Sequence, residues 1–207
     1  MHKLPDYIEK RYIALKADIR KRLNDFAEVP QSKYFYELCY CICTPQSKAA
    51  NAYIVQRELE QRNFYDKPFN PATLLRKNTN YIRFHNTKAE RLLLAREKYP
   101  ETEHVILSDM TTRKKREWLA GNIKGIGMKE ASHFLRNIGF HNLTILDRHI
   151  LKHLVLCNIY GKIPKVATKK DYLSVEKKFL GFSRKIKISV DELDLLFWSY
   201  ETDEILK

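Results

Sequence analysis

Glycine is scarce in this chain and unevenly placed. Only 6 of the 207 residues are glycine, and none occurs in the first 120. Extended β architectures use many glycine turns, so this scarcity argues against them. The six are Gly121, Gly125, Gly127, Gly139, Gly161 and Gly181. The sequence therefore predicts an all-α protein.

Cysteine is also limited, to Cys39, Cys41, Cys43 and Cys157. Three of the four lie in the apolar run of residues 38–43, and no further metal ligands follow nearby at a suitable spacing. This pattern favours buried thiols in a reducing cytoplasm over a metal site.

Long hydrophobic segments are missing as well. No apolar run approaches the length of a membrane span, and the first residues lack the apolar core of a signal peptide. We therefore expect a soluble, cytoplasmic protein without a membrane partner. Hydrophobic residues still make up 44% of the chain, enough for one sizeable core or two small lobes.

Positive charge is what the chain has in excess. Its 38 Lys and Arg outweigh 25 Asp and Glu, which gives a formal net charge of +13. The basic residues are spread along the sequence and do not form a terminal tail. This distribution favours a folded surface that binds a polyanion such as nucleic acid.

Apolar residues recur at helical spacing through most of the chain. No repeat or obvious linker separates the helices, so we expect two helical lobes within one unit, residues 1–207. The predicted helices cover residues 35–42 (capped by Ser32), 49–55, a turn near 74–75, 84–97, 112–121 (begun at Thr111 or Thr112), 128–138, 148–155, 170–180 and 189–200.

A tight glycine turn is predicted between two of these helices, at residues 123–127. Gly125 and Gly127 permit a positive φ and the close approach of another backbone. Free N–H groups at the start of the following helix favour an anion, and a DNA phosphate fits such a site. The same pattern also occurs at an ordinary helix corner.

Two residues around this turn carry the chemistry of interest. Lys129 directly follows the turn, where partial burial and nearby cations make an amine easier to deprotonate and so nucleophilic. Asp147 precedes the next helix, where a carboxylate can cap the helix or stabilise a developing positive charge. The alternatives are a solvated lysine and a purely structural cap.

Taken together, residues 119–154 resemble the helix-hairpin-helix superfamily of base-excision DNA glycosylases. The most specific part is Lys-Gly-Ile-Gly-Met-Lys (124–129) followed by Leu-Asp-Arg-His (146–149). The resemblance places the hairpin and catalytic segment at about 111–156. It implies that Lys129 is the Schiff-base nucleophile of a bifunctional glycosylase/lyase and that Asp147 is the catalytic carboxylate.

Further segments are similar to the prokaryotic type-2 8-oxoguanine DNA glycosylase/lyases. The resemblance implies that Gln46 enters the duplex where the base has been flipped out. It also implies a base pocket formed by Trp198, the terminal Lys207, Phe84 and Asp194. Core packing is the competing role for Trp198 and the favoured one for Phe84.

The same resemblance suggests how the DNA is held. Carbonyls of Gly121, Ile123 and Ile126 match places where some members hold a cation that bridges to phosphate. The chain departs from the commonest hairpin by carrying Asn122 and Lys124 around Ile123. The expected DNA-contacting residues are Gln46, Lys124, Gly125, Gly127, Arg148 and His149.

The expected function is therefore excision of 8-oxoguanine followed by β-elimination. The expected partner is double-stranded DNA with an oxidised purine, bound by a monomer at the prokaryotic nucleoid. No cofactor is required for these steps, and the cysteine spacing excludes the iron–sulfur loop of some relatives. The alternatives are a glycosylase for another oxidised base and a non-catalytic hairpin that only grips DNA.

Overall fold

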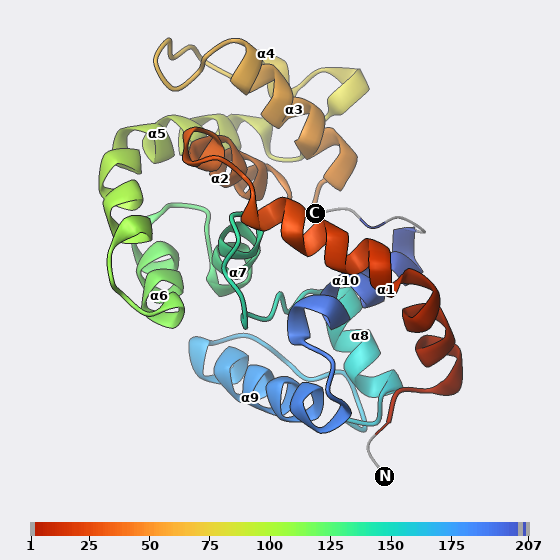
Figure 1. Cartoon of the computed structure of the whole chain (residues 1–207). Coiled ribbons are helices and arrows are strands. Elements are labelled where there is room, and N and C mark those ends of the chain that lie inside the picture. The colour runs from red at the N-terminus through yellow and green to blue at the C-terminus, as the bar shows by residue number, and fades with distance from the viewer. Residues whose placement is uncertain (1–2, 203–204, 206–207) are drawn as a thin grey trace. The chain divides into compact units, whose positions relative to one another are not determined.

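The computed structural model describes residues 3–202 and 205 (Figure 1). Every regular element in these residues is a helix, which confirms the all-α prediction. The helices are α1 (Asp6–Ala27), α2 (Tyr34–Cys43), α3 (Ala49–Gln61), α4 (Ala72–Leu75), α5 (His85–Leu107), α6 (Thr112–Asn122), α7 (Met128–Asn137), α8 (Arg148–Leu156), α9 (Lys169–Ile186) and α10 (Val190–Thr202), with short 3₁₀ turns at Gln31–Lys33 and Asn78–Asn80.

The chain divides into two compact units. Unit 1 combines residues 1–28 with 135–207, and unit 2 comprises residues 29–134. The boundary at residue 135 falls inside α7. None of the described helices is long and apolar enough to cross a membrane.

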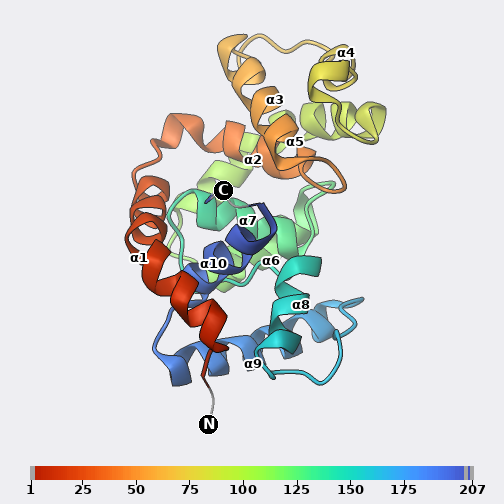
Figure 2. The ribbon, with the colours of Figure 1, turned by 90° about the vertical axis from the view of Figure 1, so that its right-hand side faces the viewer.

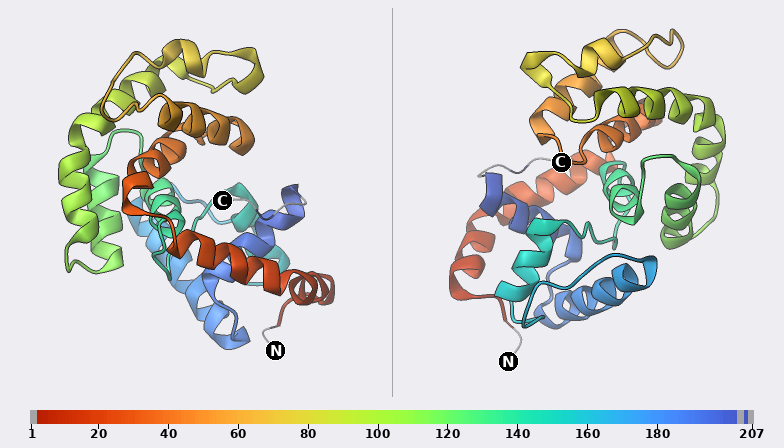
Figure 3. Two further views of the ribbon diagram at one scale, coloured as in Figure 1. Left: turned by 45° about the horizontal axis from the view of Figure 1, so that its top comes forward. Right: turned by 180° about the vertical axis from the view of Figure 1, so that it is seen from behind.

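Unit 2 is built around α2, which packs against both α3 and α5. Every residue from Phe35 to Cys43 is buried, so the apolar run noted in the sequence forms the centre of this unit. Figure 3 shows α6 alongside the later part of α5, and the two helices are in contact. The prediction of buried thiols is confirmed, and burial raises the pKa of Cys43 to about 12.

Unit 1 is built around α10, which contacts α1, α8 and α9 (Figure 2). On the α8 side, the His153 ring stacks on Phe197 with centroids 4.6 Å apart. Burial lowers the pKa of His153 to about 4, so this ring is neutral at physiological pH. On the α1 side, Arg20 pairs with Glu192 at 2.9 Å.

Several helix ends differ from the prediction. Ser32 lies in a 3₁₀ turn and does not cap α2, which begins at Tyr34 without a side-chain cap. The helix that was expected to end at Glu97 continues to Leu107. Thr111 is the N-cap of α6, as expected, and accepts a hydrogen bond from the backbone N–H of Lys114.

Candidate active site

The turn between α6 and α7 has the predicted glycine conformation. Gly125 has φ +90°, a value that L side chains rarely adopt. The backbone N–H of Ile126 donates to the Ile123 carbonyl at 3.1 Å and closes the turn. The side chains of Ile123 and Ile126 are buried and anchor it. The expected helix-hairpin-helix element, formed by α6, the glycine turn and α7, is therefore present.

A basic side chain from α5 lies against this turn. A Cβ atom added to Gly125 would sit 2.6 Å from Cδ of Arg91 and 3.1 Å from its Nε. Gly125 is thus required both by its φ and by the approach of Arg91. Sequence reasoning missed Arg91, because nothing in the pattern of α5 indicates which residues face the turn. Lys124, the predicted phosphate contact, is exposed beside it.

Lys129 lies in the first turn of α7 and its side chain is 32% exposed. Its Nζ is 3.0 Å from Oε1 of Glu130. The other carboxylate oxygen, Oε2, accepts a hydrogen bond from the Gly127 N–H at 3.2 Å. An acidic group therefore occupies the backbone donor where a phosphate is expected. Glu130 was missed, although a Glu three residues after the residue that precedes a helix, here Gly127, is a known capping signal.

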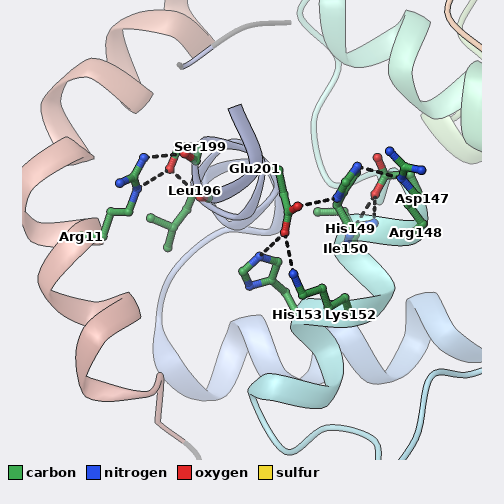
Figure 4. A network of polar contacts seen from close by, with 10 residues as sticks. All are labelled: Arg11, Asp147, Arg148, His149, Ile150, Lys152, His153, Leu196, Ser199 and Glu201. Carbon is green, nitrogen blue, oxygen red and sulfur yellow. Dashed lines mark hydrogen bonds and ion pairs between the residues drawn. The ribbon is translucent and has the colours of Figure 1, made fainter. Parts of the chain in front are cut away.

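Asp147 is the N-cap of α8 (Figure 4). Its Oδ1 accepts hydrogen bonds from the backbone N–H groups of His149 at 2.9 Å and Ile150 at 2.8 Å. The predicted capping role is confirmed. Because one oxygen satisfies both donors, Oδ2 is not needed for the cap, and the half-buried side chain keeps an acceptor for other chemistry.

The segment that leads to Asp147 is fixed by buried polar contacts. The Thr144 hydroxyl donates to Glu176 at 3.1 Å, and the Tyr172 hydroxyl donates to the Thr144 carbonyl at 2.5 Å. Both partners come from α9, whose first turn is closed by a capping box at Thr168. This bracing holds the start of α8 in place.

A chain of polar contacts continues from Asp147 along α8 to the end of α10 (Figure 4). Arg148 Nε donates to His149 Nε2 at 3.0 Å, and His149 Nδ1 lies 3.0 Å from Oε2 of Glu201. Both ring nitrogens of His149 therefore have a polar partner, Nε2 in Arg148 and Nδ1 in Glu201. Glu201 also contacts Lys152 at 3.1 Å and was not singled out from the sequence.

Trp198, a predicted pocket residue, is half-buried on α10. Its ring centroid is 5.3 Å from that of His149. The structure therefore brings Asp147, Arg148, His149 and Trp198 together at the junction of α8 and α10. The base-pocket role of Trp198 stays a prediction, and Lys207 lies outside the described residues.

Asp194, also expected in the pocket, is 2% exposed. Its Oδ2 is 3.6 Å from Nη1 of Arg136, which is equally buried. Burial raises the pKa of Asp194 to about 7, the carboxylates of Asp147 and Asp191 add to the rise, and Arg136 opposes it. Asp194 thus lies within electrostatic reach of Asp147, and its contact with substrate stays a prediction.

Gln46 and Phe84 are both exposed residues with left-handed backbones. Their φ values are 56° and 59°. Gln46 lies in the loop between α2 and α3, and Phe84 immediately precedes α5. The core-packing interpretation of Phe84 is wrong, because its side chain is 51% exposed and the Arg83 guanidinium lies 5.0 Å from its ring centre. An exposed aromatic side chain on a strained backbone indicates a contact surface.

Residues 3–202 contain no group of His, Cys, Asp and Glu that could hold a metal ion. The expected cation site uses carbonyls of Gly121, Ile123 and Ile126 instead, and the Ile123 carbonyl already accepts the Ile126 N–H. A carbonyl has a second lone pair, so this site stays a prediction.

Comparison with known proteins places these features in a family. The profile of the 8-oxoguanine DNA glycosylase (Ogg-HhH) family matches residues 19–188. An 8-oxoguanine DNA glycosylase/AP lyase of Fusobacterium nucleatum is 40% identical, over 97% of this chain and 96% of the relative.

Solved structures agree. The crystal structure of the 8-oxoguanine DNA glycosylase of Methanocaldococcus jannaschii superposes with a TM-score of 0.84 at 32% identity, over 97% of this chain and 96% of that chain. A second structure of the glycosylase/lyase of that organism, in complex with a 15mer DNA containing 8-oxoguanine, gives a TM-score of 0.82 at 32% identity, over 96% and 98%. This chain belongs to the 8-oxoguanine DNA glycosylase family.

Proposed function

We propose that the protein is a bifunctional DNA glycosylase/AP lyase that excises 8-oxoguanine from double-stranded DNA. The observation that carries the proposal is the placement of Lys129, partly exposed in the first turn of α7 directly after a glycine turn. Near full-length relatives named for both activities support it, as does the DNA-bound structure of a similar protein.

The chemistry proceeds through the Lys129 amine. Its neutral form attacks the sugar carbon C1′, so that a C1′–Nζ bond forms while the bond to the base breaks and the base leaves with a proton. The C1′–O4′ bond of the adduct then breaks as the nitrogen lone pair forms the C1′=Nζ bond, and O4′ takes up a proton. The resulting imine makes the C2′ hydrogen acidic. Loss of that proton expels the 3′ phosphate and cuts the strand. Neither a nucleotide cofactor nor a redox metal is needed.

Asp147 and Glu130 supply the acid–base environment. Asp147 stabilises positive charge on the sugar. Its Oδ2 is available for this task, because the two capping hydrogen bonds use Oδ1. Glu130 holds the Lys129 amine at 3.0 Å in the free protein. A phosphate that binds the Gly127 N–H competes with Glu130 for the same donor. DNA binding therefore weakens the ion pair between Glu130 and Lys129.

Phosphate contacts position the duplex and carry no base information. We assign them to the hairpin, with Lys124, Gly125 and Gly127, and to Arg148 and His149 at the start of α8. A cation on the carbonyls of the turn can add to this grip.

Base contacts decide which lesion is removed. Trp198, Phe84, Asp194 and Lys207 are assigned to the base pocket, and Gln46 to the space that the base leaves in the duplex. The proposed enzyme acts as a monomer, in the cytoplasm at the nucleoid, where its substrate is.

The test is borohydride trapping, which reduces the imine to a stable amine. Three matched duplexes carry a single 8-oxoguanine, an unmodified guanine or an oxidised pyrimidine. The expected result is a covalent adduct with the 8-oxoguanine duplex alone. It should be absent in Lys129→Gln, which still binds the DNA.

Lys124→Gln is the matched control, because it removes a lysine from the same turn. It should weaken binding yet form the adduct at saturating protein. An adduct with the pyrimidine lesion only would keep the mechanism and overturn the substrate. Tight binding without any adduct would show a non-catalytic DNA-binding protein.

A further inference from the structure

Lys88 is a buried lysine near the start of α5, with only 2% of its surface exposed. Its Nζ donates to the carbonyl of Cys43 at 2.7 Å, to the carbonyl of Pro45 at 2.6 Å and to Oγ of Ser47 at 3.2 Å. An ammonium group has three hydrogens, so every donor has an acceptor. These hydrogen bonds offset the free-energy cost of burying a cation, so the Lys88 ammonium group is held firmly in place.

The three acceptors belong to one loop, residues 43–47 between α2 and α3. Cys43 is the last residue of α2, where carbonyls lack helical partners and favour a cation. Pro45 contributes the carbonyl of the peptide group that leads into Gln46. Lys88 therefore fixes both the end of the helix and the peptide plane directly before Gln46.

Gln46 needs such support. Its left-handed φ of 56° is unfavourable for a residue with a side chain, and its side chain is exposed. A strained, exposed conformation persists only where the surroundings impose it. Lys88 supplies that constraint from inside the unit.

The hydrogen bonds of Lys88 also connect the 43–47 loop to the residues around Phe84. Ser47 Oγ, which accepts from Lys88, also accepts from the backbone N–H of Arg83 at 3.0 Å. The backbone N–H of Lys88 donates to the Phe84 carbonyl at 2.9 Å. One buried residue thus ties together two loops that each present an exposed left-handed residue, Gln46 and Phe84.

We propose that Lys88 is a positioning residue that pre-forms two loops for extrusion of the damaged base: the Gln46 loop, which enters the DNA duplex, and the Phe84 loop, which receives the base in its pocket. The inference rests on the proposed function and names a group that touches neither DNA nor the sugar. Pre-formed loops save the cost of ordering on binding, which would otherwise slow extrusion. Burial lowers the pKa of Lys88 to about 8, so the ammonium form predominates below that pH.

The decisive comparison uses two substrates. One is a duplex with 8-oxoguanine, from which the base must be extruded. The other is a single strand that already carries an abasic site, in which no base has to leave a stack. Lys88→Met should slow single-turnover excision from the duplex by about tenfold to a hundredfold. Borohydride trapping on the abasic single strand should match the parent protein.

A fluorescent 2-aminopurine next to the lesion reports extrusion directly. Its rise on binding should be slower in Lys88→Met than in the parent protein. Lys98→Met is the matched control, since Lys98 also lies on α5, pairs with Glu101 and contacts neither loop. It should change neither the fluorescence rise nor either reaction.

Ser47→Ala covers the case in which Lys88→Met does not fold. It removes the link between the two loops while the carbonyl contacts of Lys88 remain, and it should slow only the duplex reaction. Equal slowing on both substrates would overturn the proposal and indicate an effect of Lys88 on Lys129. Unchanged duplex excision would also overturn it. If the proposed function itself is wrong, the parent protein will form no trapped adduct on the 8-oxoguanine duplex.

Discussion

At the scale of single residues, Asp147 combines two tasks. Its Oδ1 caps α8 through two backbone N–H groups, at 2.9 and 2.8 Å, while the proposed chemistry needs the negative charge. Asn is as good an N-cap as Asp but carries no charge. Substitution can therefore separate the structural role from the catalytic one.

We predict that Asp147→Asn keeps the stability of the parent protein but loses excision activity by about a hundredfold or more. Asp147→Ala should lose the activity and also about 1 kcal/mol of unfolding free energy, because the cap is gone. Single-turnover excision and urea unfolding measure the two effects. Full activity in Asp147→Asn would show that Asp147 is a cap alone.

Residues with local signals could be predicted from the sequence, and residues with distant partners could not. Gly125 and Asp147 were predictable, because a positive φ and a helix cap are set by neighbours in the chain. Lys88 and Arg91 look like solvated lysine and arginine on a helix. Only tertiary packing places Lys88 on the 43–47 loop and Arg91 against Gly125.

At the scale of elements, helix centres were predicted better than helix ends. α5 continues through Pro100 to Leu107, ten residues beyond the expected end. Tyr99, Thr102 and Ile106 are buried on this extension, so packing outweighs the local cost of the proline. α1 was not predicted, because its charged sequence hides a narrow apolar stripe that is buried in unit 1.

The α6–α7 turn is the element whose backbone can be tested most directly. Gly125→Ala should lower the unfolding free energy by about 1–2 kcal/mol, because a side chain at φ +90° is strained. The new methyl group would also displace Arg91 and distort the turn that is proposed to bind phosphate, so DNA binding should weaken. Thermal unfolding and a binding titration with an 8-oxoguanine duplex measure both changes.

Gly121→Ala is the control with the opposite sign. Gly121 lies within α6, and an added Cβ would meet nothing within 4 Å. Alanine there should raise the unfolding free energy by about 0.4–1 kcal/mol. Equal effects of the two substitutions would contradict the assignment of the strained position to Gly125.

At the scale of the whole molecule, the charge of +13 predicts salt-dependent DNA binding. Each phosphate that the protein neutralises releases counterions, so the logarithm of affinity falls linearly with that of salt concentration. Net charge alone and specific contacts predict different effects of substitutions on this salt dependence. If the charge of the whole molecule sets the affinity, removal of any lysine or arginine should change the salt dependence by the same amount. If specific contacts set it, only removal of residues at the binding surface should change the salt dependence.

We predict that Arg148→Gln lowers the salt slope by about 1 and weakens binding to damaged and undamaged duplexes alike, since a phosphate contact carries no sequence information. Lys3→Gln removes the same formal charge from an exposed residue that pairs with Asp6 at 2.9 Å, and it should leave the slope unchanged. Fluorescence anisotropy titrations over a series of salt concentrations measure both slopes. Equal changes in the two variants would mean that Arg148 makes no phosphate contact and that binding follows net charge.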